Sequence, residues 1–234
     1  YCELFYYLAK PLGLETKIIA GRVKDLYGGI EGTKHAWLSV NVDGKDILID
    51  PTWGAGYVKG DTFVRNDHDM SWFDIDPYWL IFTHFPTHKD EQFIAEPIKW
   101  KDFLRLPSLY PSSTEYGWDG REMFTQILDG SIQSLPQIFE QYSRFVGFPE
   151  IPMQGVLQPG KYYTFTLKKK QANEIILIHG NEFIHEADWQ QDGDQHTLKF
   201  MPISGGTLSL GIAQKTDIGR TYSTVVLYEV SSPT

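Results

Sequence analysis

Residues 35–53 read HAWLSVNVDGKDILIDPTW, and this stretch decides how the first part of the chain folds. Two segments that alternate apolar and polar residues, 35–42 and 45–50, flank Asp43-Gly44, a dipeptide typical of two-residue hairpin turns. Such a turn sets the register of the two strands, so that residue 42 pairs with 45, 40 with 47 and 38 with 49. The stretch therefore predicts a β-hairpin.

The alternation of side chains along each strand gives this hairpin two unlike faces. One face carries His35 and Asp50 as diagonal neighbours, roughly 7 Å apart at the backbone and close enough for a side-chain hydrogen bond. A carboxylate bonded to one ring nitrogen fixes the tautomer of a histidine and favours the imidazolium, which is the task of the acid in a catalytic triad. The pair also fits a surface contact or a satisfied core pair, so the hairpin alone leaves both interpretations open. The other face is apolar and is expected to be buried: Ala36, Leu38, Val40, Ile47 and Ile49.

Trp37 and Trp53 flank the histidine–aspartate pair, and Pro51 stops the second strand directly after the aspartate. Both tryptophans are candidate walls of a dry substrate cleft. Simple packing in the interior is the alternative for each of them.

The residues before the hairpin predict a helix over 3–12 and a strand over 15–23. Pro11 lies in the last turn of the helix, and Gly13 ends it. The glycine-rich loop 27–32 is either a lid over the cleft or a tight connection. The apolar residues of the helix recur at helical spacing: Leu4, Phe5, Leu8 and Leu12.

The pattern of residues in the sequence changes twice after the hairpin. Residues 51–72 read as a loop, and short helices are expected at WKDFLRL, REMFTQIL and around PQIFEQYSRF. Short alternating strands with turn signals between them follow, and they indicate a β-sandwich. We therefore expect a core domain over 1–96, a connecting segment with short helices over 97–154, and a β-sandwich domain over 155–234.

Composition and charge argue against several classes of function. The net charge is −9, whereas binding of nucleic acid requires a basic face, so nucleic acid is not an expected partner. No apolar run approaches the length of a membrane span. Cys2 is the single cysteine, so no disulfide can form within the chain.

His84 and His88 are four residues apart, a spacing that on a helix suits two ligands of one metal ion. Pro86 lies between them and breaks such a helix, and no third ligand is evident. We therefore expect neither a metal nor another cofactor. For Asp67-His68-Asp69, in a polar loop, a solvated turn and a contact with a cation or with the cleft are both open.

Three segments together resemble the transglutaminase-like cysteine proteins. HAWLSVNVDGKDILIDPTWGAG resembles their His and Asp segments, ELFYYLAKPLGLETKIIAGRV their helix and following strand, and WFDIDPYWLIFTHFP an extension of the kyphoscoliosis-peptidase-like branch. The likeness covers about residues 1–95 closely, and the later part resembles the β-rich region of some bacterial members loosely. It implies an α+β fold: a transglutaminase-like (papain-like) core with an antiparallel sheet packed on a helix, its N-terminal part missing from the chain, followed by a C-terminal all-β sandwich domain.

The resemblance also implies roles for individual residues. In the family a cysteine at the N-terminus of the helix is the nucleophile, so His35 takes the role of base and proton donor, and Asp50 orients it. The helix matches without a gap when Cys2 occupies a small-residue position, and the nucleophile is then expected three residues before Tyr1. Cys2 itself is the alternative nucleophile, which requires a four-residue deletion in the helix.

The implied activity is acyl transfer through a thioester, in a peptidase or amidase that acts on a peptide or protein. The resemblance further implies a bacterial, extracytoplasmic protein at the periplasm or cell surface. Two other functions stay open: an inactive binding protein that keeps the fold without the site, and a scaffold whose C-terminal sandwich binds carbohydrate or protein. The sequence does not indicate the oligomeric state.

Overall fold

The computed structural model describes residues 1–25, 29–30, 34–59, 61–66, 69–172, 174–216 and 219–232. The chain divides into two compact units: unit 1, Tyr1–Ser113, and unit 2, Thr114–Thr234. The expected connecting segment 97–154 is shared between them, because its helix α4 (Trp100–Phe103) belongs to unit 1 and α5 (Gly120–Leu128) to unit 2. Among the described residues, no helix is long and apolar enough to cross a membrane.

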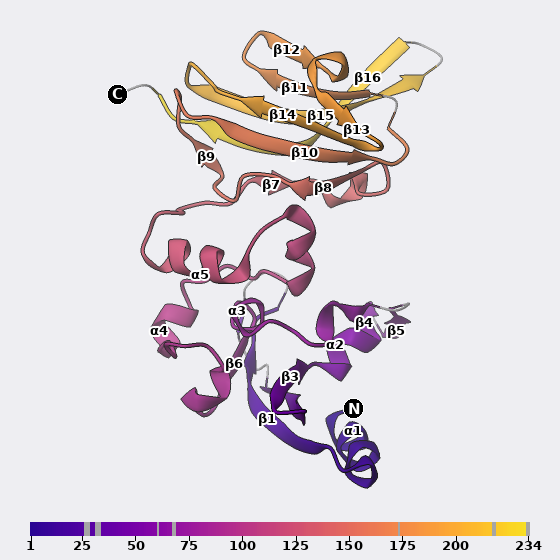
Figure 1. Cartoon of the computed structure of the whole chain (residues 1–234), viewed down its shortest axis with the longest axis vertical. Helices are drawn as coiled ribbons and strands as arrows, with labels where there is room; N and C mark the ends of the chain where they lie inside the picture. Colours follow the sequence, from indigo (N-terminus) through magenta and orange to yellow (C-terminus); the bar gives the residue numbers. More distant parts are fainter. Residues whose placement is uncertain are drawn as a thin grey trace. The chain divides into compact units, whose positions relative to one another are not determined.

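The centre of unit 1 is an antiparallel sheet of four strands in the order β3-β2-β1-β6 (Figure 1). The predicted hairpin is confirmed together with its register, since residue 42 pairs with 45, 40 with 47 and 38 with 49. Asp43 and Gly44 form the turn at φ angles of 52° and 84°, the left-handed conformations that this dipeptide adopts readily. The strands are β1 (Glu15–Val23), β2 (Lys34–Val42), β3 (Lys45–Ile49) and β6 (His84–Pro86).

Helix α1 (Cys2–Ala9) packs on the apolar face of this hairpin. It ends as predicted, because Pro11 falls in a short 3-10 turn, η1 (Lys10–Leu12), and Gly13 follows at a φ of 74°. Cys2 and Phe5 form the side of the helix that packs against the sheet. The leucines that indicated the helix from their spacing lie on its other sides and are exposed: Leu4, Leu8 and Leu12.

The prediction of a loop over 51–72 was wrong, because short regular elements fill this segment. Asp50, Asp69 and Asp76 each accept backbone N–H groups at the start of a helical turn. Such caps, with proline in the first turn of two of them, start helices that are too short to show apolar periodicity. The elements within 51–72 are α2 (Pro51–Ala55), β4 (Gly56–Lys59), β5 (Thr62–Arg65) and η2 (Met70–Trp72). Three further short elements follow this segment: α3 (Pro77–Leu80), η3 (Lys89–Gln92) and η4 (Pro111–Tyr116).

Unit 2 contains two sheets, in the orders β13-β14-β10-β8 and β12-β11-β15-β16-β7, with β9 also beside β16 (Figure 1). The rings of Phe165 in the first sheet and Tyr228 in the second have centroids 5.8 Å apart, so buried side chains of the two sheets meet. The strands are β7 (Gln137–Ile138), β8 (Val146–Glu150), β9 (Val156–Leu157), β10 (Tyr163–Lys169), β11 (Glu174–His179), β12 (Glu182–His185), β13 (Gln190–Asp192), β14 (Gln195–Phe200), β15 (Gly206–Thr216) and β16 (Gly219–Val230).

The helix expected at REMFTQIL is present as α5, but the one expected around PQIFEQYSRF is not. Strand β7 pairs there with β16, and the 3-10 turn η5 (Glu140–Tyr142) follows. Pairing with a long strand from the far end of the chain overrides the local helical preference. A second 3-10 turn in this unit is η6 (Glu186–Asp188).

Candidate active site

Asp50 stands where β3 ends and α2 begins, and the backbone holds it there. Its Oδ1 accepts hydrogen bonds from the N–H groups of Thr52 and Trp53, at 2.9 and 3.0 Å. Its own N–H donates to the carbonyl of Trp72 at 3.0 Å. The carboxylate is completely buried. The helix cap therefore satisfies one oxygen and fixes the direction of the other.

The second oxygen of Asp50 accepts hydrogen bonds from two histidines. His35 Nε2 lies 2.6 Å from Oδ2, and His84 Nε2 lies 3.0 Å from it. The histidines come from β2 and β6, the strands on either side of β1, where Gly21 is paired with His35 and Val23 with His84. The pairing of three strands thus brings both rings to one carboxylate. The expected hydrogen bond between His35 and Asp50 is present.

Gly21 of β1 makes room for this arrangement. A Cβ added at Gly21 would lie 2.6 Å from Cη2 of Trp37 and 2.3 Å from the carbonyl oxygen of Phe85. No side chain fits at such distances, so the approach of β6 to β1 and the seating of the Trp37 ring both require glycine. A glycine inside an otherwise regular strand is the sequence signal of such a close approach.

Three tryptophans surround the two histidines. The Trp37 ring centroid lies 6.4 Å from that of His35 and 4.9 Å from that of His84, and Trp37 is completely buried. Trp53 lies 5.8 Å from His35 and 4.7 Å from His84 and is partly exposed, while Trp72 lies 5.7 Å from His84. Of the two cleft candidates, Trp37 is therefore an interior packing residue, and Trp53 keeps some exposed surface beside His35.

The dry surroundings shift the pKa values of two groups. Burial by itself raises the pKa of Asp50, but the hydrogen bonds from His35 and His84 outweigh it and hold that pKa well below its ordinary value. Burial lowers the pKa of His84, and the hydrogen bond to Asp50 opposes this only in part. At neutral pH the site therefore contains an ionised Asp50 and a neutral His84.

Within the described part of the chain, His35, Asp50 and His84 form a group whose potential ligand atoms lie within 4.8 Å of one another. Two histidines and a carboxylate are a ligand set of catalytic zinc sites. In this structure both Nε2 atoms lie at hydrogen-bond distance from one carboxylate oxygen of Asp50. His84 and His88, whose spacing would suit two ligands of one metal ion on a helix, do not form such a pair, because His84 is buried in this group whereas His88 is exposed.

Cys2 lies in the apolar layer on the opposite face of the hairpin. It packs with Leu38, Val40 and Ile49, and its Sγ donates to the carbonyl of Ala36 at 3.1 Å. Burial and, to a smaller extent, the charge of Asp50 raise the pKa of the thiol. Cys2 is therefore a neutral thiol at pH 7, which is the behaviour of a small buried helix residue.

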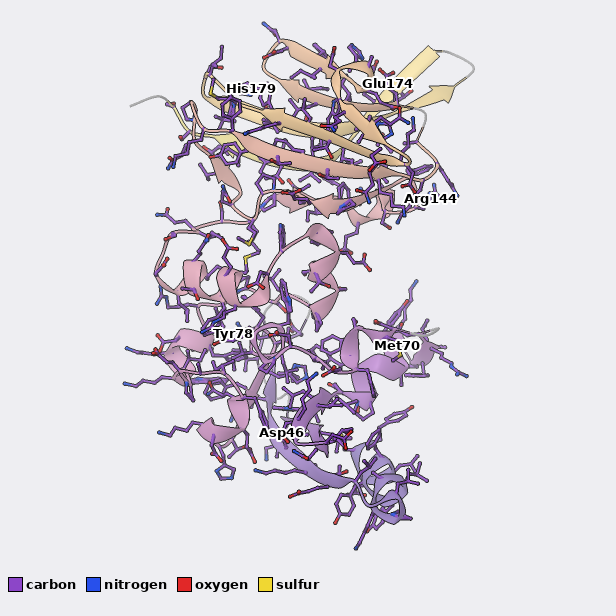
Figure 2. The ribbon with its side chains drawn as sticks, viewed as in Figure 1. Asp46, Met70, Tyr78, Arg144, Glu174 and His179 are labelled. Atoms are coloured by element: carbon purple, nitrogen blue, oxygen red, sulfur yellow. The ribbon has the colours of Figure 1, made fainter. Side chains whose placement is uncertain are left out.

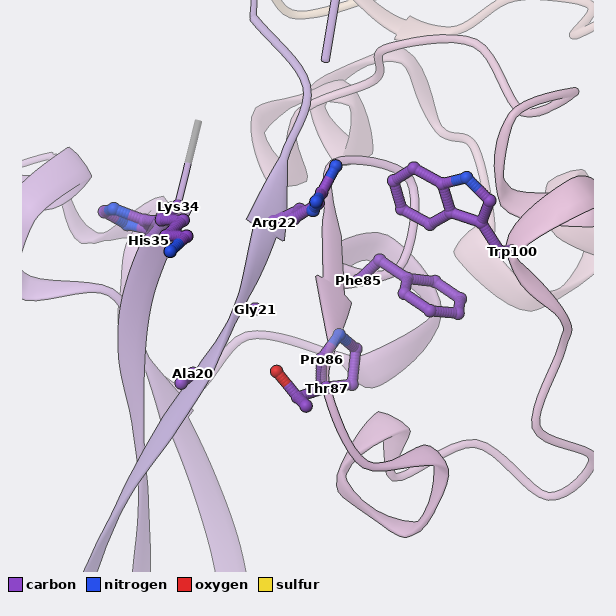
Figure 3. A pocket seen from close by; sticks show the side chains of 9 residues that line it. All are labelled: Ala20, Gly21, Arg22, Lys34, His35, Phe85, Pro86, Thr87 and Trp100. Carbon is purple, nitrogen blue, oxygen red and sulfur yellow. The ribbon is translucent and has the colours of Figure 1, made fainter. Parts of the chain in front are cut away.

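A cavity of about 490 Å³ opens next to His35 (Figure 3). Phe85 and Trp100 stand on one side of the view, and Lys34 and His35 stand on the other. Arg22 reaches from β1 toward Trp100, with its guanidinium carbon 5.8 Å from the ring centroid. The cavity therefore presents aromatic surface and two cations beside the histidine. The rest of its lining comes from Ala20, Gly21, Pro86 and Thr87.

His84 is the site residue that sequence reasoning missed as a partner of Asp50. Its segment, WFDIDPYWLIFTHFP, carries a family resemblance, but only the pairing of β6 with β1 shows which way the histidine faces. Parts of two other candidates, loop 27–32 and Asp67-His68, lie outside the described residues. The buried His179 of unit 2 (Figure 2) offers a contrast, because its Nδ1 lies 3.0 Å from a backbone oxygen, that of Thr207.

Comparisons with known proteins show sequence similarity over part of the chain. No family model matches the sequence. The chain is similar to the kyphoscoliosis peptidase of Mus musculus, with 29% identity over 126 residues that cover 50% of this chain and 18% of the mouse protein. It is also similar to the kyphoscoliosis peptidase of Homo sapiens, with 29% identity over 113 residues, 44% of this chain and 16% of the human protein. The chain thus spans less than a fifth of the length of these relatives, and the likeness supports a relationship to the transglutaminase-like family.

Proposed function

We propose that this chain carries the histidine and aspartate of a transglutaminase-like cysteine hydrolase, a peptidase or amidase that works by acyl transfer. The observation behind the proposal is the 2.6 Å hydrogen bond between His35 Nε2 and Asp50 Oδ2. Asp50 is buried, ionised and fixed by a helix cap, and these are the properties of the orienting acid in a triad. The similarity to proteins named peptidases supports the same activity.

The direction of α1 bears on where the nucleophile lies. Its C-terminal end leads into β1 at Glu15, which pairs with Asn41, whereas Cys2 near its N-terminal end contacts Ala36. The helix therefore points its N-terminus toward the His35 end of β2. A residue four positions before Cys2 would lie roughly 6 Å further along the axis. We place the nucleophilic cysteine there, three residues before Tyr1, where the helix N-terminus lowers a thiol pKa.

Each of these residues has a role in the proposed reaction. The thiolate attacks the carbonyl carbon of an amide, the C–N bond breaks, and the His35 imidazolium gives its proton to the leaving amine. Water attacks the thioester that remains and His35 accepts a proton from that water. The C–S bond then breaks, the carboxylic acid leaves, and the cysteine thiolate and the His35 imidazolium are restored. Because Nε2 of His35 is engaged with Asp50, Nδ1 is the nitrogen that exchanges protons. The cavity beside His35, with partly exposed Trp53 nearby, is the candidate site for the acyl donor.

The test is turnover of a fluorogenic peptide or amide library by the full-length protein that contains this chain. We expect hydrolysis that iodoacetamide blocks, and we expect His35→Ala to abolish it while the circular dichroism spectrum is unchanged. His88→Ala is the matched control, because His88 is an exposed histidine in the same unit. Equal turnover by wild type and His35→Ala would overturn the assignment of His35.

A further inference from the structure

The mechanism above uses one of the two histidines that donate to Asp50 and leaves the second unexplained. We infer that His84 is a positioning residue, a neutral hydrogen-bond donor that keeps the Asp50 carboxylate aligned on His35. The inference rests on the proposed function. It concerns a buried residue that contacts the orienting aspartate.

The hydrogen bonds around His84 determine its tautomer. An ionised carboxylate only accepts, so His84 Nε2, 3.0 Å from Asp50 Oδ2, must carry a proton. His84 Nδ1 lies 2.8 Å from Oγ1 of Thr83. The side chain of His84 is fully buried, which disfavours a proton on both nitrogens. The Asp50 carboxylate therefore selects the Nε2–H tautomer of His84, and Nδ1 accepts from the Thr83 hydroxyl, which stabilises this tautomer.

The surroundings of His84 keep it in this one state. The rings of Trp37, Trp53 and Trp72 pack around His84, in addition to its contact with the Thr83 hydroxyl. The charged or titratable groups that act on it are Asp50 and His35. A neutral donor in such a place stabilises the carboxylate without adding a second positive charge that would compete with the His35 imidazolium.

The hydrogen-bond donors to Asp50 come from different elements, so His84 ties the carboxylate to β6. Oδ1 is held by the first turn of α2, and Oδ2 is held by β2 through His35 and by β6 through His84. Without His84, Oδ2 has one side-chain donor left and the charge of the carboxylate is concentrated on His35. The imidazolium is then favoured and holds its proton to higher pH, and the carboxylate is less well oriented.

The experiment compares three variants of the full-length protein. His84→Leu removes the donor, His84→Gln keeps an N–H group at about the reach of Nε2, and Thr83→Val removes the hydroxyl that donates to Nδ1. His179→Gln is the matched control, because it changes a buried histidine of unit 2. Turnover is measured as kcat/KM across pH, and the protonation of the His84 ring nitrogens is read by NMR on protein labelled with ¹⁵N-histidine.

We expect His84→Leu to lower kcat/KM by about 10- to 100-fold, the usual effect of removing an orienting partner. We expect it to move the alkaline limb of the profile, where the thiolate–imidazolium pair loses its proton, upward by about one pH unit. His84→Gln should restore most of both effects, and Thr83→Val should shift the profile in the same direction but less. The NMR spectrum should show a protonated Nε2 and an unprotonated Nδ1 for His84.

Two results would overturn the inference. One is a His84→Leu variant whose profile keeps the wild-type limb, as a purely structural role predicts, while His35→Ala is inactive. The other is a His84 ring protonated at Nδ1. A wild-type protein without thiol-dependent turnover would instead overturn the proposed function and with it the catalytic part of this inference, and NMR would still decide whether His84 donates to Asp50.

Discussion

Substituting asparagine for Asp50 tests the hydrogen bonds at the centre of the site, because asparagine has nearly the size of aspartate but carries no charge. The amide oxygen can still accept the two backbone N–H groups at the start of α2. The amide NH₂ then occupies the place of Oδ2, which lies 2.6 Å from His35 Nε2 and 3.0 Å from His84 Nε2. The Nε2–H groups of His35 and His84 then face another donor, the amide NH₂, and both charge-assisted hydrogen bonds are lost.

The size of the effect follows from those two bonds. A hydrogen bond to a charged group contributes about 1.5–3 kcal/mol to stability. Losing two of them should therefore lower the unfolding free energy of unit 1 by about 3–6 kcal/mol. Each histidine can relieve part of the clash by moving its proton to Nδ1. For His84 this reverses the hydrogen bond with Thr83, now 2.8 Å long. We therefore expect a loss near the lower end, about 3 kcal/mol.

The loss should also depend on pH. The folded-state pKa of Asp50 is lowered, so its ionised form contributes stability above the unfolded-state value of about 3.9, and that contribution disappears as the pH falls through the folded-state value. The difference between wild type and Asp50→Asn should be full above about pH 5 and should shrink below about pH 4.

Urea unfolding followed by tryptophan fluorescence measures this difference, because Trp53 and Trp72 pack directly around the site. Asp46→Asn is the matched control, since Asp46 (Figure 2) is an exposed aspartate in β3, the strand that leads to Asp50. An Asp50→Asn protein no less stable than Asp46→Asn at pH 7 would refute the reasoning.

Three further predictions concern other residues of unit 1. Gly21→Ala should lower the unfolding free energy by about 1–3 kcal/mol in the same urea assay, because its Cβ would lie 2.6 Å from the Trp37 ring; a midpoint equal to wild type would contradict this. Lys24 is buried and donates to two backbone carbonyls, and burial lowers its pKa to about 8. Because the unfolded state then binds more protons between pH 8 and about 10, wild-type stability should rise over this range relative to Lys24→Met, and parallel pH curves for the two proteins would argue against it. Native Cys2 should react with iodoacetamide far more slowly than the unfolded chain, and Cys2→Ala should keep the turnover of the full-length protein; rapid alkylation of the native protein at pH 7 would reverse the interpretation of this thiol.

Local signals in the sequence are sufficient for the hairpin and for one half of the site. The turn Asp43-Gly44 sets the register, and the two-residue period of a strand then puts His35 and Asp50 on one face. Pro11 and Gly13 determine in the same way where the first helical segment ends. These features depend on residues close together in the chain, so they can be read without knowledge of the rest of the fold.

The other half of the site depends on contacts between distant residues. His84 is 34 positions from Asp50, and it reaches the carboxylate only because β6 pairs with β1 in a particular register. The exposure of the leucines of α1 and the burial of Trp37 were likewise set by which side of each element meets its neighbour. The sequence by itself determined the hairpin that joins a histidine to an aspartate. Only the tertiary structure decided that a second, buried histidine shares that aspartate, because no local rule specifies which strands pair across the sheet.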